Sequence, residues 1–265
     1  MSNNSPIPPN RIKQALREGK SVVGTMIAEI RQPAVVQLLA NAGFDFVIID
    51  NEHGAFNLET IADLARMAVY VGVTPFVRIP DLTYPYIAQS LDAGAQGIMA
   101  PRISTAQQAR EVAQMMKYPP MGVRGSALSR GYTQFKGGSV VEAMATANEE
   151  TMLIIQVETR GAIENIEEIV AIPGVDITLV GPNDLSIALG VPGQQNHPDM
   201  QRAIQKVIDA CQGYNVYPAI HINDLNLAVH WARQGMRLIS SNAEIGLLVN
   251  GGLQVTKAIG EAFGR

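Results

Sequence analysis

The amino-acid sequence predicts an α/β protein in which one (β/α)8 barrel domain spans residues 1–265. Short runs rich in β-branched residues alternate with longer stretches of helical periodicity, and the chain accommodates eight such units. Several of these runs have apolar residues on both faces, which is typical of strands covered by helices outside and by packed side chains inside. The length agrees, because barrels of roughly 250 residues commonly form one domain.

The expected strands are short and follow one another in regular order: 22–27, 45–50, 75–79, 97–101, 152–158, 176–181, 216–221 and 236–241. The expected helices follow them in turn: 33–42, 58–71, 84–93, 105–117, 161–171, 199–213, 223–235 and 244–263. Glycine recurs between a helix and the next strand, at Gly43, Gly72, Gly94, Gly174, Gly213 and Gly235. A left-handed helix cap favours a residue without a Cβ at this point, so these glycines support the proposed boundaries.

Two segments fall outside this alternation. Residues 1–10 (MSNNSPIPPN) lack the basic and then apolar pattern of a signal peptide, and we expect a flexible arm there. Residues 118–150 are too long for a plain connection, so we expect a loop or helical insertion after the fourth strand, serving as a lid or an interface. An open doubly wound sheet is the structural rival, but neither GxGxxG nor GxxxxGK[ST] occurs.

Composition narrows the possible partners. The chain has 20 Lys+Arg and 24 Asp+Glu, a net charge of −4, whereas a nucleic-acid binder usually needs a basic surplus. No apolar run approaches the roughly 18 residues of a membrane span. One cysteine excludes an internal disulfide and fits a cytoplasmic location. These features favour an enzyme or binding protein for small molecules.

Polar residues end several of the predicted strands, at the face where barrels carry their active sites. They are Asp50, Asn51, Glu52 and His53 after the second strand, Arg78 in the third, Gln156 and Glu158 in the fifth, Gly181 to Asp184 after the sixth, His221 in the seventh, and Ser240 and Ser241 in the eighth. We therefore expect an acid, a base and a cation to converge at one end of the barrel.

Several of these residues allow two interpretations. Glu158 and Asp184 offer the oxygen ligands that Mg²⁺ and Mn²⁺ prefer, but each could instead cap a helix or pair with an arginine. Arg78 could hold a substrate oxygen or form an ion pair with Asp50 or Asp81. His53 is a candidate general acid or base, with a surface-loop histidine as the alternative.

Lysine is absent from every predicted strand end. A Schiff-base aldolase needs a desolvated lysine at the mouth of the barrel. The sequence therefore disfavours that mechanism.

Six segments of the chain carry a resemblance to a known family: IIDNEHGAFN at 48–57, FVRIP at 76–80, LDAGAQGI at 91–98, GVRG at 122–125, QVET at 156–159 and GPNDLS at 181–186. Together they resemble the HpcH/HpaI family of class II, metal-dependent pyruvate aldolases. LGVPGQQNHPDMQRAI at 189–204 is also similar to this family. The resemblance covers nearly the whole chain in order, and it implies a (β/α)8 barrel assembled as a homo-oligomer, a trimer or a hexamer of two trimers with exchanged C-terminal helices.

The resemblance also implies roles for individual residues. It makes Glu158 and Asp184 the ligands of a divalent ion (Mg²⁺, Mn²⁺ or Co²⁺), with Gln156 as a polar neighbour of bound pyruvate. It makes Arg78 the cation on the enolate oxygen, His53 the acid or base, and Asp50 and Glu52 neighbours of the metal waters. Backbone N–H groups around Gly181 to Asp184, a stretch that includes Pro182 and Asn183, would hold the pyruvate carboxylate. Asp92 corresponds to an acid that would reach the histidine only from a neighbouring subunit.

The implied reaction is reversible aldol cleavage of a 4-hydroxy-2-oxo acid, such as a 2-keto-3-deoxy sugar acid or 4-hydroxy-2-oxo-heptanedioate. The products are pyruvate, formed through its enolate, and an aldehyde. Asn183 departs from the alanine frequent in relatives, and DNEHGAFN is also similar to a family member that decarboxylates oxaloacetate. An oxaloacetate decarboxylase or related enolate-forming lyase therefore stays open, and a non-catalytic keto-acid-binding barrel is the alternative from another class.

Overall fold

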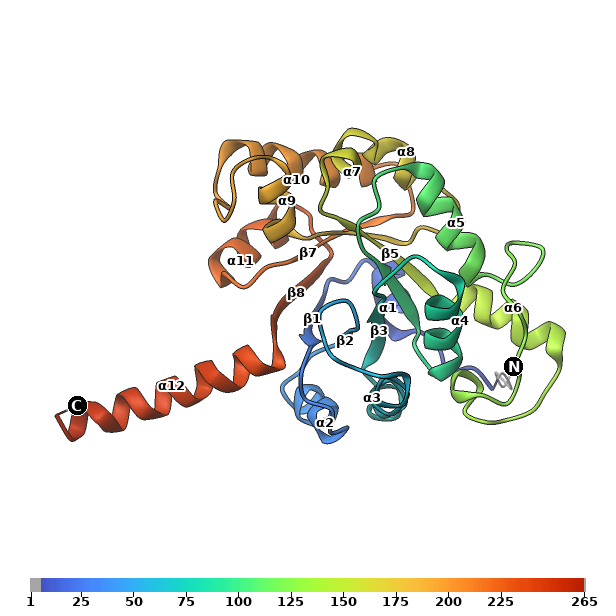
Figure 1. Ribbon diagram of the computed structural model, residues 1–265, viewed down its shortest axis with the longest axis horizontal. Coiled ribbons are helices and arrows are strands. Elements are labelled where there is room, and N and C mark those ends of the chain that lie inside the picture. Colours follow the sequence, from blue (N-terminus) through green and yellow to red (C-terminus); the bar gives the residue numbers. More distant parts are fainter. Residues whose placement is uncertain (1–5, 265) are drawn as a thin grey trace.

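A computed structural model describes residues 6–264, and its eight parallel strands close into a barrel (Figure 1). The strands are β1 (Val22–Ile27), β2 (Phe46–Asp50), β3 (Thr74–Arg78), β4 (Gly97–Ala100), β5 (Met152–Val157), β6 (Ile177–Val180), β7 (Tyr217–His221) and β8 (Leu238–Ala243). Each strand pairs with the next, and β8 pairs with β1. The predicted fold class is confirmed, and every predicted strand end lies within two residues of the observed one.

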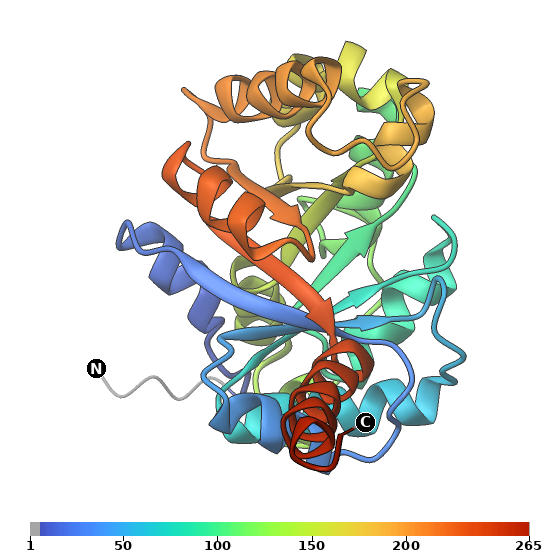
Figure 2. The same ribbon diagram turned by 90° about the vertical axis from the view of Figure 1, so that its left-hand side faces the viewer.

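The helices surround the strands (Figure 2). Those expected from the sequence are α2 (Ala34–Asn41), α3 (Leu58–Val71), α4 (Tyr84–Ala93), α5 (Ala106–Met116), α7 (Arg160–Glu164), α8 (Ile166–Val170), α10 (Pro198–Cys211), α11 (Leu225–Arg233) and α12 (Glu244–Ala262). The single helix expected over 161–171 is interrupted at Asn165, which ends α7 and precedes α8. Four further elements are α1 (Arg11–Arg17), η1 (Gly131–Thr133), α6 (Val140–Glu150) and α9 (Pro182–Ala188).

The left-handed conformation expected at six glycines is confirmed, although Gly174 lies in the turn after Ala171, the C-cap of α8. The backbone φ angles of Gly43, Gly72, Gly94, Gly174, Gly213 and Gly235 lie between +82° and +121°. Each of these positions lies between a helix and the next strand, where L-residues with a Cβ are disfavoured. The local sequence therefore predicts where the chain turns from a helix back to the next strand.

Two apolar layers hold the barrel together. Alternate residues of the strands point inward, where Phe46 and Phe76 meet edge to face with their ring centroids 5.8 Å apart. The other faces of the same strands pack against the surrounding helices. Because side chains fill the interior, the polar residues that continue the inward-facing rows beyond Ile48, Phe76 and Ile154 emerge at the carboxyl end of the barrel.

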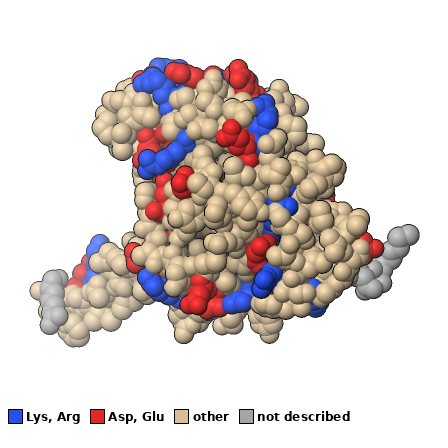
Figure 3. Space-filling model, turned by 45° about the vertical axis from the view of Figure 1, so that its right-hand side comes forward, with Lys and Arg blue, Asp and Glu red and all other residues tan. Residues whose placement is uncertain are grey.

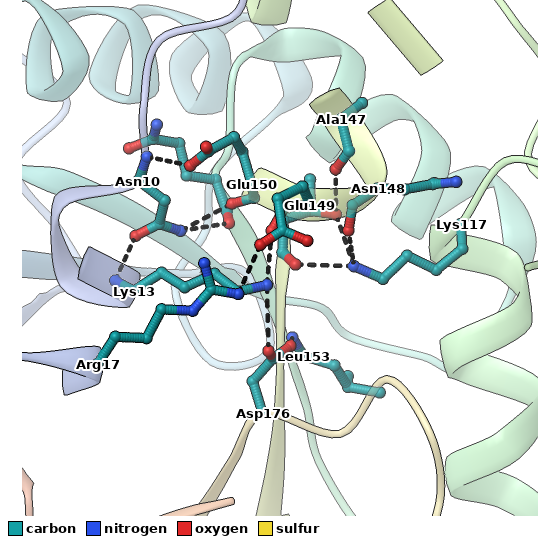
Figure 4. A network of polar contacts seen from close by, with 12 residues as sticks. Asn10, Lys13, Arg17, Lys117, Ala147, Asn148, Glu149, Glu150, Leu153 and Asp176 are labelled. Atoms are coloured by element: carbon teal, nitrogen blue, oxygen red, sulfur yellow. Dashed lines mark hydrogen bonds and ion pairs between the residues drawn. The ribbon is translucent and has the colours of Figure 1, made fainter. Parts of the chain in front are cut away.

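A polar network closes the amino end of the barrel (Figure 4). The backbone N–H of Asn10 donates to Glu150 Oε2 at 2.6 Å, and its side chain donates to the Gln96 carbonyl at 3.1 Å. Ile7 and Asn10 are both buried. Of the arm expected over residues 1–10, the part from Ile7 to Asn10 packs against the barrel, and residues 1–5 lie outside the described residues.

The segment 118–150 contributes to the same end of the barrel. Its helix α6 ends two residues before β5 begins. Lys117, the residue that precedes the segment, donates from Nζ to the carbonyls of Asn148 and Thr151 at 2.7 and 2.8 Å. Burial lowers the pKa of Lys117 to about 8. The helical insertion expected after the fourth strand is thus tied to the amino ends of the strands, away from the predicted active face.

Helix α12 projects from the barrel (Figure 1). Its first residue, Glu244, is buried and accepts hydrogen bonds from the backbone N–H groups of Ala28, Glu29 and Ile30 at 2.7–2.9 Å. Farther along, large apolar side chains are 52–74% exposed: Leu248, Val249, Leu253, Val255, Ile259 and Phe263. Among the described helices, none is both long and apolar enough to cross a membrane.

Candidate active site

Asp50, Arg78 and Glu52 form a buried charged group at the carboxyl ends of β2 and β3. Arg78 donates from Nε to Asp50 Oδ1 at 2.8 Å and from Nη2 to Asp50 Oδ2 at 2.6 Å. Its remaining nitrogen, Nη1, lies 3.1 Å from Glu52 Oε2. All three side chains are less than 10% exposed. The ion pair anticipated between Arg78 and Asp50 is present, and Asp81 is not its partner.

The charge of Asp50 is maintained by these contacts. Burial alone would raise the pKa of this carboxyl group, but the hydrogen bonds and charge of Arg78 lower it, as do the backbone N–H groups of His53 and Glu52. The net effect holds the pKa of Asp50 below its ordinary value. A guanidinium has five N–H donors, so Arg78 retains capacity for a substrate oxygen after its three contacts.

The two histidines considered from the sequence lie in different environments. His53 is exposed in the loop after β2, and its backbone N–H donates to Asp50 Oδ1 at 3.3 Å. His221 at the end of β7 pairs through Nδ1 with Ser240 Oγ at 2.8 Å. Burial and then the nearby charge of Arg78 lower the pKa of His221 to about 4. His221 is therefore neutral near pH 7 and is accounted for by its partner, whereas the His53 side chain remains accessible.

Gln156 and Glu158 continue the inward row of β5. Gln156 Nε2 donates to Glu158 Oε2, while Gln156 Oε1 is buried without a hydrogen-bond partner among residues 6–264. Burial raises the pKa of Glu158 to about 7, and the negative charges of Glu52 and Asp184 add to this effect. A buried acid beside two further carboxylates favours a bound cation or a proton.

The loop after β6 brings the backbone close to this pair. A Cβ on Gly181 would lie 3.1 Å from Gln156 Nε2 and 3.2 Å from Glu158 Oε2, so only glycine leaves both side chains undisturbed. Asp184 is exposed in the first turn of α9, and Asn183 Oδ1 accepts a hydrogen bond from Gln195 Nε2 at 3.1 Å.

The N–H groups at this loop are fewer than expected. Gly181 donates its N–H to the Val157 carbonyl at 3.1 Å, and Pro182 has no N–H. Of the four residues expected to hold a carboxylate, Asn183 and Asp184 are therefore the two with N–H groups to offer, since both lie in the first turn of a helix.

The donor set fits a hard divalent ion held by few protein ligands. No group of three or more His, Cys, Asp or Glu side chains suited to a metal occurs within the described part of the chain. Mg²⁺ and Mn²⁺ often take one or two carboxylates and complete their shells with water and substrate. Glu158 with its raised pKa, the charge of Asp184 and the unpaired Gln156 Oε1 match that requirement.

Arg102 is the site residue that sequence inspection missed. It follows β4, its backbone N–H donates to Glu158 Oε1 at 2.8 Å, and its Nε donates to Glu52 Oε1 at 3.2 Å. Its φ of 57° is left-handed, which is unusual for a residue with a Cβ. The position after the fourth predicted strand was the only available signal, because the residue lies outside the segments that carry the family resemblance.

Asp92 is not brought to this site within the chain. It lies on α4, where Arg124 Nη2 contacts its Oδ1 at 2.6 Å. The Arg124 guanidinium in turn lies 4.8 and 5.1 Å from the ring centres of Tyr118 and Tyr132. Asp92 also lines a surface groove beside α3 and α4. A role at the strand ends would require a second copy of the chain.

Comparison with known proteins points to one family. Residues 26–250 match the family model described as HpcH/HpaI aldolase/citrate lyase. The chain is 33% identical to a hydroxypyruvate/pyruvate aldolase of Roseobacter denitrificans, over 94% of this chain and 97% of that one. It is 32% identical to a 4-hydroxy-2-oxo-heptane-1,7-dioate aldolase of Escherichia coli, over 96% and 95% of the two chains. A crystal structure of an HpcH/HpaI aldolase from Desulfitobacterium hafniense superposes with a TM-score of 0.89 at 34% identity, covering 93% of this chain and 95% of that one.

Proposed function

The chain belongs to the HpcH/HpaI aldolase/citrate lyase family, and we propose that it is a metal-dependent carbon–carbon lyase that cleaves a 4-hydroxy-2-oxo acid to pyruvate and an aldehyde. The observation that carries this proposal is the meeting of opposite charges at one end of the barrel. The buried cation Arg78 lies beside Asp50 and Glu52, and its charge also reaches the Glu158 carboxyl group. Such a site suits a substrate whose negative charge grows during the reaction.

Glu158 and Asp184 are the residues that would hold the divalent ion, with Gln156 adjacent. When bound, such an ion acts as a Lewis acid toward a keto oxygen and offsets negative charge. The pyruvate carboxylate is held by the N–H groups of Asn183 and Asp184. Gly181 supports this arrangement because its missing Cβ leaves Gln156 and Glu158 in place.

Cleavage begins with removal of the C4 hydroxyl proton by His53, whose loop is anchored to Asp50 through its backbone N–H. The C3–C4 bond then breaks: C4 leaves as the aldehyde carbon, and the bonding electrons form the pyruvate enolate. Arg78 donates its remaining N–H groups to the enolate oxygen, an interaction worth several kcal/mol in a buried site (about 3 for one donor). The proton held by His53 returns, directly or through solvent, to C3 and completes pyruvate, while Asp50 and Glu52 keep Arg78 in position throughout.

A homo-oligomer, a trimer or hexamer, is part of this proposal. The exposed apolar side chains of α12 need a partner surface, and a second copy of the chain supplies one. The same assembly gives Asp92 a route to the His53 of a neighbouring copy, although Arg124 binds Asp92 within its own chain.

Deuterium exchange at the pyruvate methyl group tests the enolate chemistry without knowledge of the aldehyde. Pyruvate is incubated in D2O with the enzyme and Mg²⁺ or Mn²⁺, and the methyl signal is followed by NMR. We expect exchange that stops when a chelator is added. A protein that binds pyruvate without exchange would be a keto-acid-binding barrel, and exchange that survives chelation would contradict the metal assignment.

A further inference from the structure

A guanidinium at the rim of the barrel has unpaired donors. The side chain of Arg102 is 73% exposed, and its Nε donates to Glu52 Oε1 at 3.2 Å. Neither of its Nη atoms has a hydrogen-bond partner in the described range 6–264. Two N–H-bearing nitrogens therefore face solvent beside the carboxylates of the candidate metal site.

The backbone fixes where this side chain begins. The φ of Arg102 is 57°, a left-handed conformation that residues with a Cβ rarely adopt. In this conformation its N–H donates to Glu158 Oε1 at 2.8 Å. Arg102 therefore combines an unusual backbone conformation with an N–H bond to a proposed metal ligand and a side-chain cation at the rim. Residues in such conformations are concentrated at functional sites.

Glu52 connects this exposed cation to the buried one. Glu52 Oε2 lies 3.1 Å from Arg78 Nη1, and Glu52 Oε1 lies 3.2 Å from Arg102 Nε. The side chains of Arg78 and Glu52 are 9% and 8% exposed, against 73% for Arg102. The contacts from Arg78 through Glu52 to Arg102 therefore lead from the interior to the rim, so that Arg102 offers a second cation to the far end of a ligand whose keto-acid end lies near Arg78.

We propose that Arg102 determines substrate specificity by binding an anionic group at the far end of the aldehyde portion of the substrate. This inference rests on the proposed aldolase function. The free edge of a guanidinium presents paired N–H donors whose spacing matches a carboxylate or a phosphate. The preferred aldehydes are therefore those with a negative charge remote from the carbonyl carbon.

Two other exposed arginines follow strands of the same barrel face but are held differently. Arg31 Nη2 donates to the Ala55 carbonyl at 2.6 Å, and Arg160 Nη2 donates to the Ala188 carbonyl at 3.0 Å. Neither bridges to Glu52 or Glu158 in the part of the chain that is described. Arg160 is therefore a matched control for a general effect of positive charge.

The experiment compares aldol addition of pyruvate to charged and neutral acceptors of the same length. Succinic semialdehyde is paired with butanal, and glyceraldehyde 3-phosphate with glyceraldehyde, and the ratio of kcat/KM is measured for each pair. The wild-type enzyme is expected to prefer the charged acceptor, less so at high ionic strength because salt screens an exposed charge. In Arg102→Gln the preference should fall about 10-fold to 100-fold, the usual range for a lost charge-assisted hydrogen bond.

Further variants distinguish the loss of the Arg102 guanidinium from backbone strain and from a general effect of positive charge. Arg102→Asn suits the left-handed backbone and should lose the preference as Arg102→Gln does. Arg160→Gln should keep the wild-type ratio. A wild-type enzyme without preference in either pair, or an unchanged ratio in both Arg102 variants, would overturn the proposal. Methyl exchange of pyruvate is measured in every variant: absence of exchange in the wild-type enzyme contradicts the aldolase function, and exchange with an unchanged ratio contradicts the role of Arg102 alone.

Discussion

Asp50 and Arg78 occupy directly opposed positions on the neighbouring strands β2 and β3, and two hydrogen bonds of 2.8 and 2.6 Å join their side chains. Both side chains continue the inward rows of the barrel, so the pair is held by strand register and not by a loop. Because Glu52 adds a second carboxylate on the other side of Arg78, the cation is fixed from two directions. A preorganised cation of this kind loses little energy to reorganisation during the reaction.

Arg78→Ala is expected to reduce pyruvate methyl exchange by about 100-fold or more, because the enolate oxygen loses its cation. It also leaves Asp50 buried without its ion-pair partner, while Glu52 keeps only its contact with Arg102, and breaking a buried pair typically costs about 3–5 kcal/mol of unfolding free energy. Exchange and urea denaturation check the two effects. The control is Arg66→Ala, which removes an exposed arginine paired with Asp63; an Arg78 variant as active and stable as this control would refute the assignment.

Glu158→Gln is expected to abolish the stabilisation of the protein by Mn²⁺. A ligand at about 100 times its Kd stabilises a folded protein by about 2.7 kcal/mol, so the wild-type Tm should rise on metal addition and fall back with chelator. Calorimetry provides the readout, independent of turnover. Glu111→Gln changes an exposed glutamate on α5 and should respond as the wild type does. A metal-dependent rise in Tm in Glu158→Gln would show that the ion binds elsewhere.

Gly181→Ala tests the close approach of the β6 loop to the site. The added Cβ would lie 3.1 Å from Gln156 Nε2 and 3.2 Å from Glu158 Oε2, so one of these side chains must move. At this distance a neighbour shifts by a few tenths of an ångström; since displacements of about 1 Å commonly cost up to about 100-fold in rate, we expect a loss of about 10-fold or less. Gly137→Ala is the control, since its Cβ meets nothing within 4 Å. Steady-state kinetics with unchanged kcat and KM in Gly181→Ala would exclude this tight packing.

His221→Asn is expected to make the protein less sensitive to acid. The pKa of His221 is lowered from 6.5 to about 4 in the folded state, so the unfolded chain binds its proton more readily between these values. Stability linked to this histidine is fully present above pH 6.5 and declines as the pH falls toward 4, by up to about 3 kcal/mol.

Asparagine keeps an acceptor for Ser240 Oγ and removes the titration. Urea unfolding between pH 4 and 7 measures the difference. His230→Asn, which removes a histidine that meets the Trp231 ring edge to face, is the control for loss of an imidazole. Identical pH profiles for wild type and His221→Asn would contradict the assignment.

Leu253→Lys is expected to weaken the proposed oligomer, because it places a charge among the exposed apolar side chains of α12. Light scattering coupled to gel filtration should detect a smaller species at low protein concentration. Asn250→Lys adds the same charge at an exposed polar position of the same helix and should leave the assembly intact. Equal masses for all three proteins would argue against α12 as the interface.

Much of the architecture follows from local patterns. Strand runs and the glycines after helices, such as Gly72 with its φ of 82°, depend on nearby residues alone, and they predicted the barrel. Local patterns predicted an insertion at 118–150 without the bounds of α6, and they did not predict α9. Helix α9 has only seven residues and follows β6 directly, and α6 belongs to an insertion whose end packs against α1, more than 100 residues earlier in the sequence.

Local sequence alone determined which side chains reach the carboxyl end of the barrel, since strand periodicity and parallel topology bring Arg78, Gln156 and Glu158 to one face. Only the tertiary structure decided how they pair. Arg78 joins Asp50 and Glu52, and Arg102 joins Glu52 to Glu158 through a left-handed backbone. Such contacts depend on distances between strands and loops more than 20 residues apart, and no spacing along the chain encodes them. The direction of α12, away from its own barrel, is likewise a property of the folded chain.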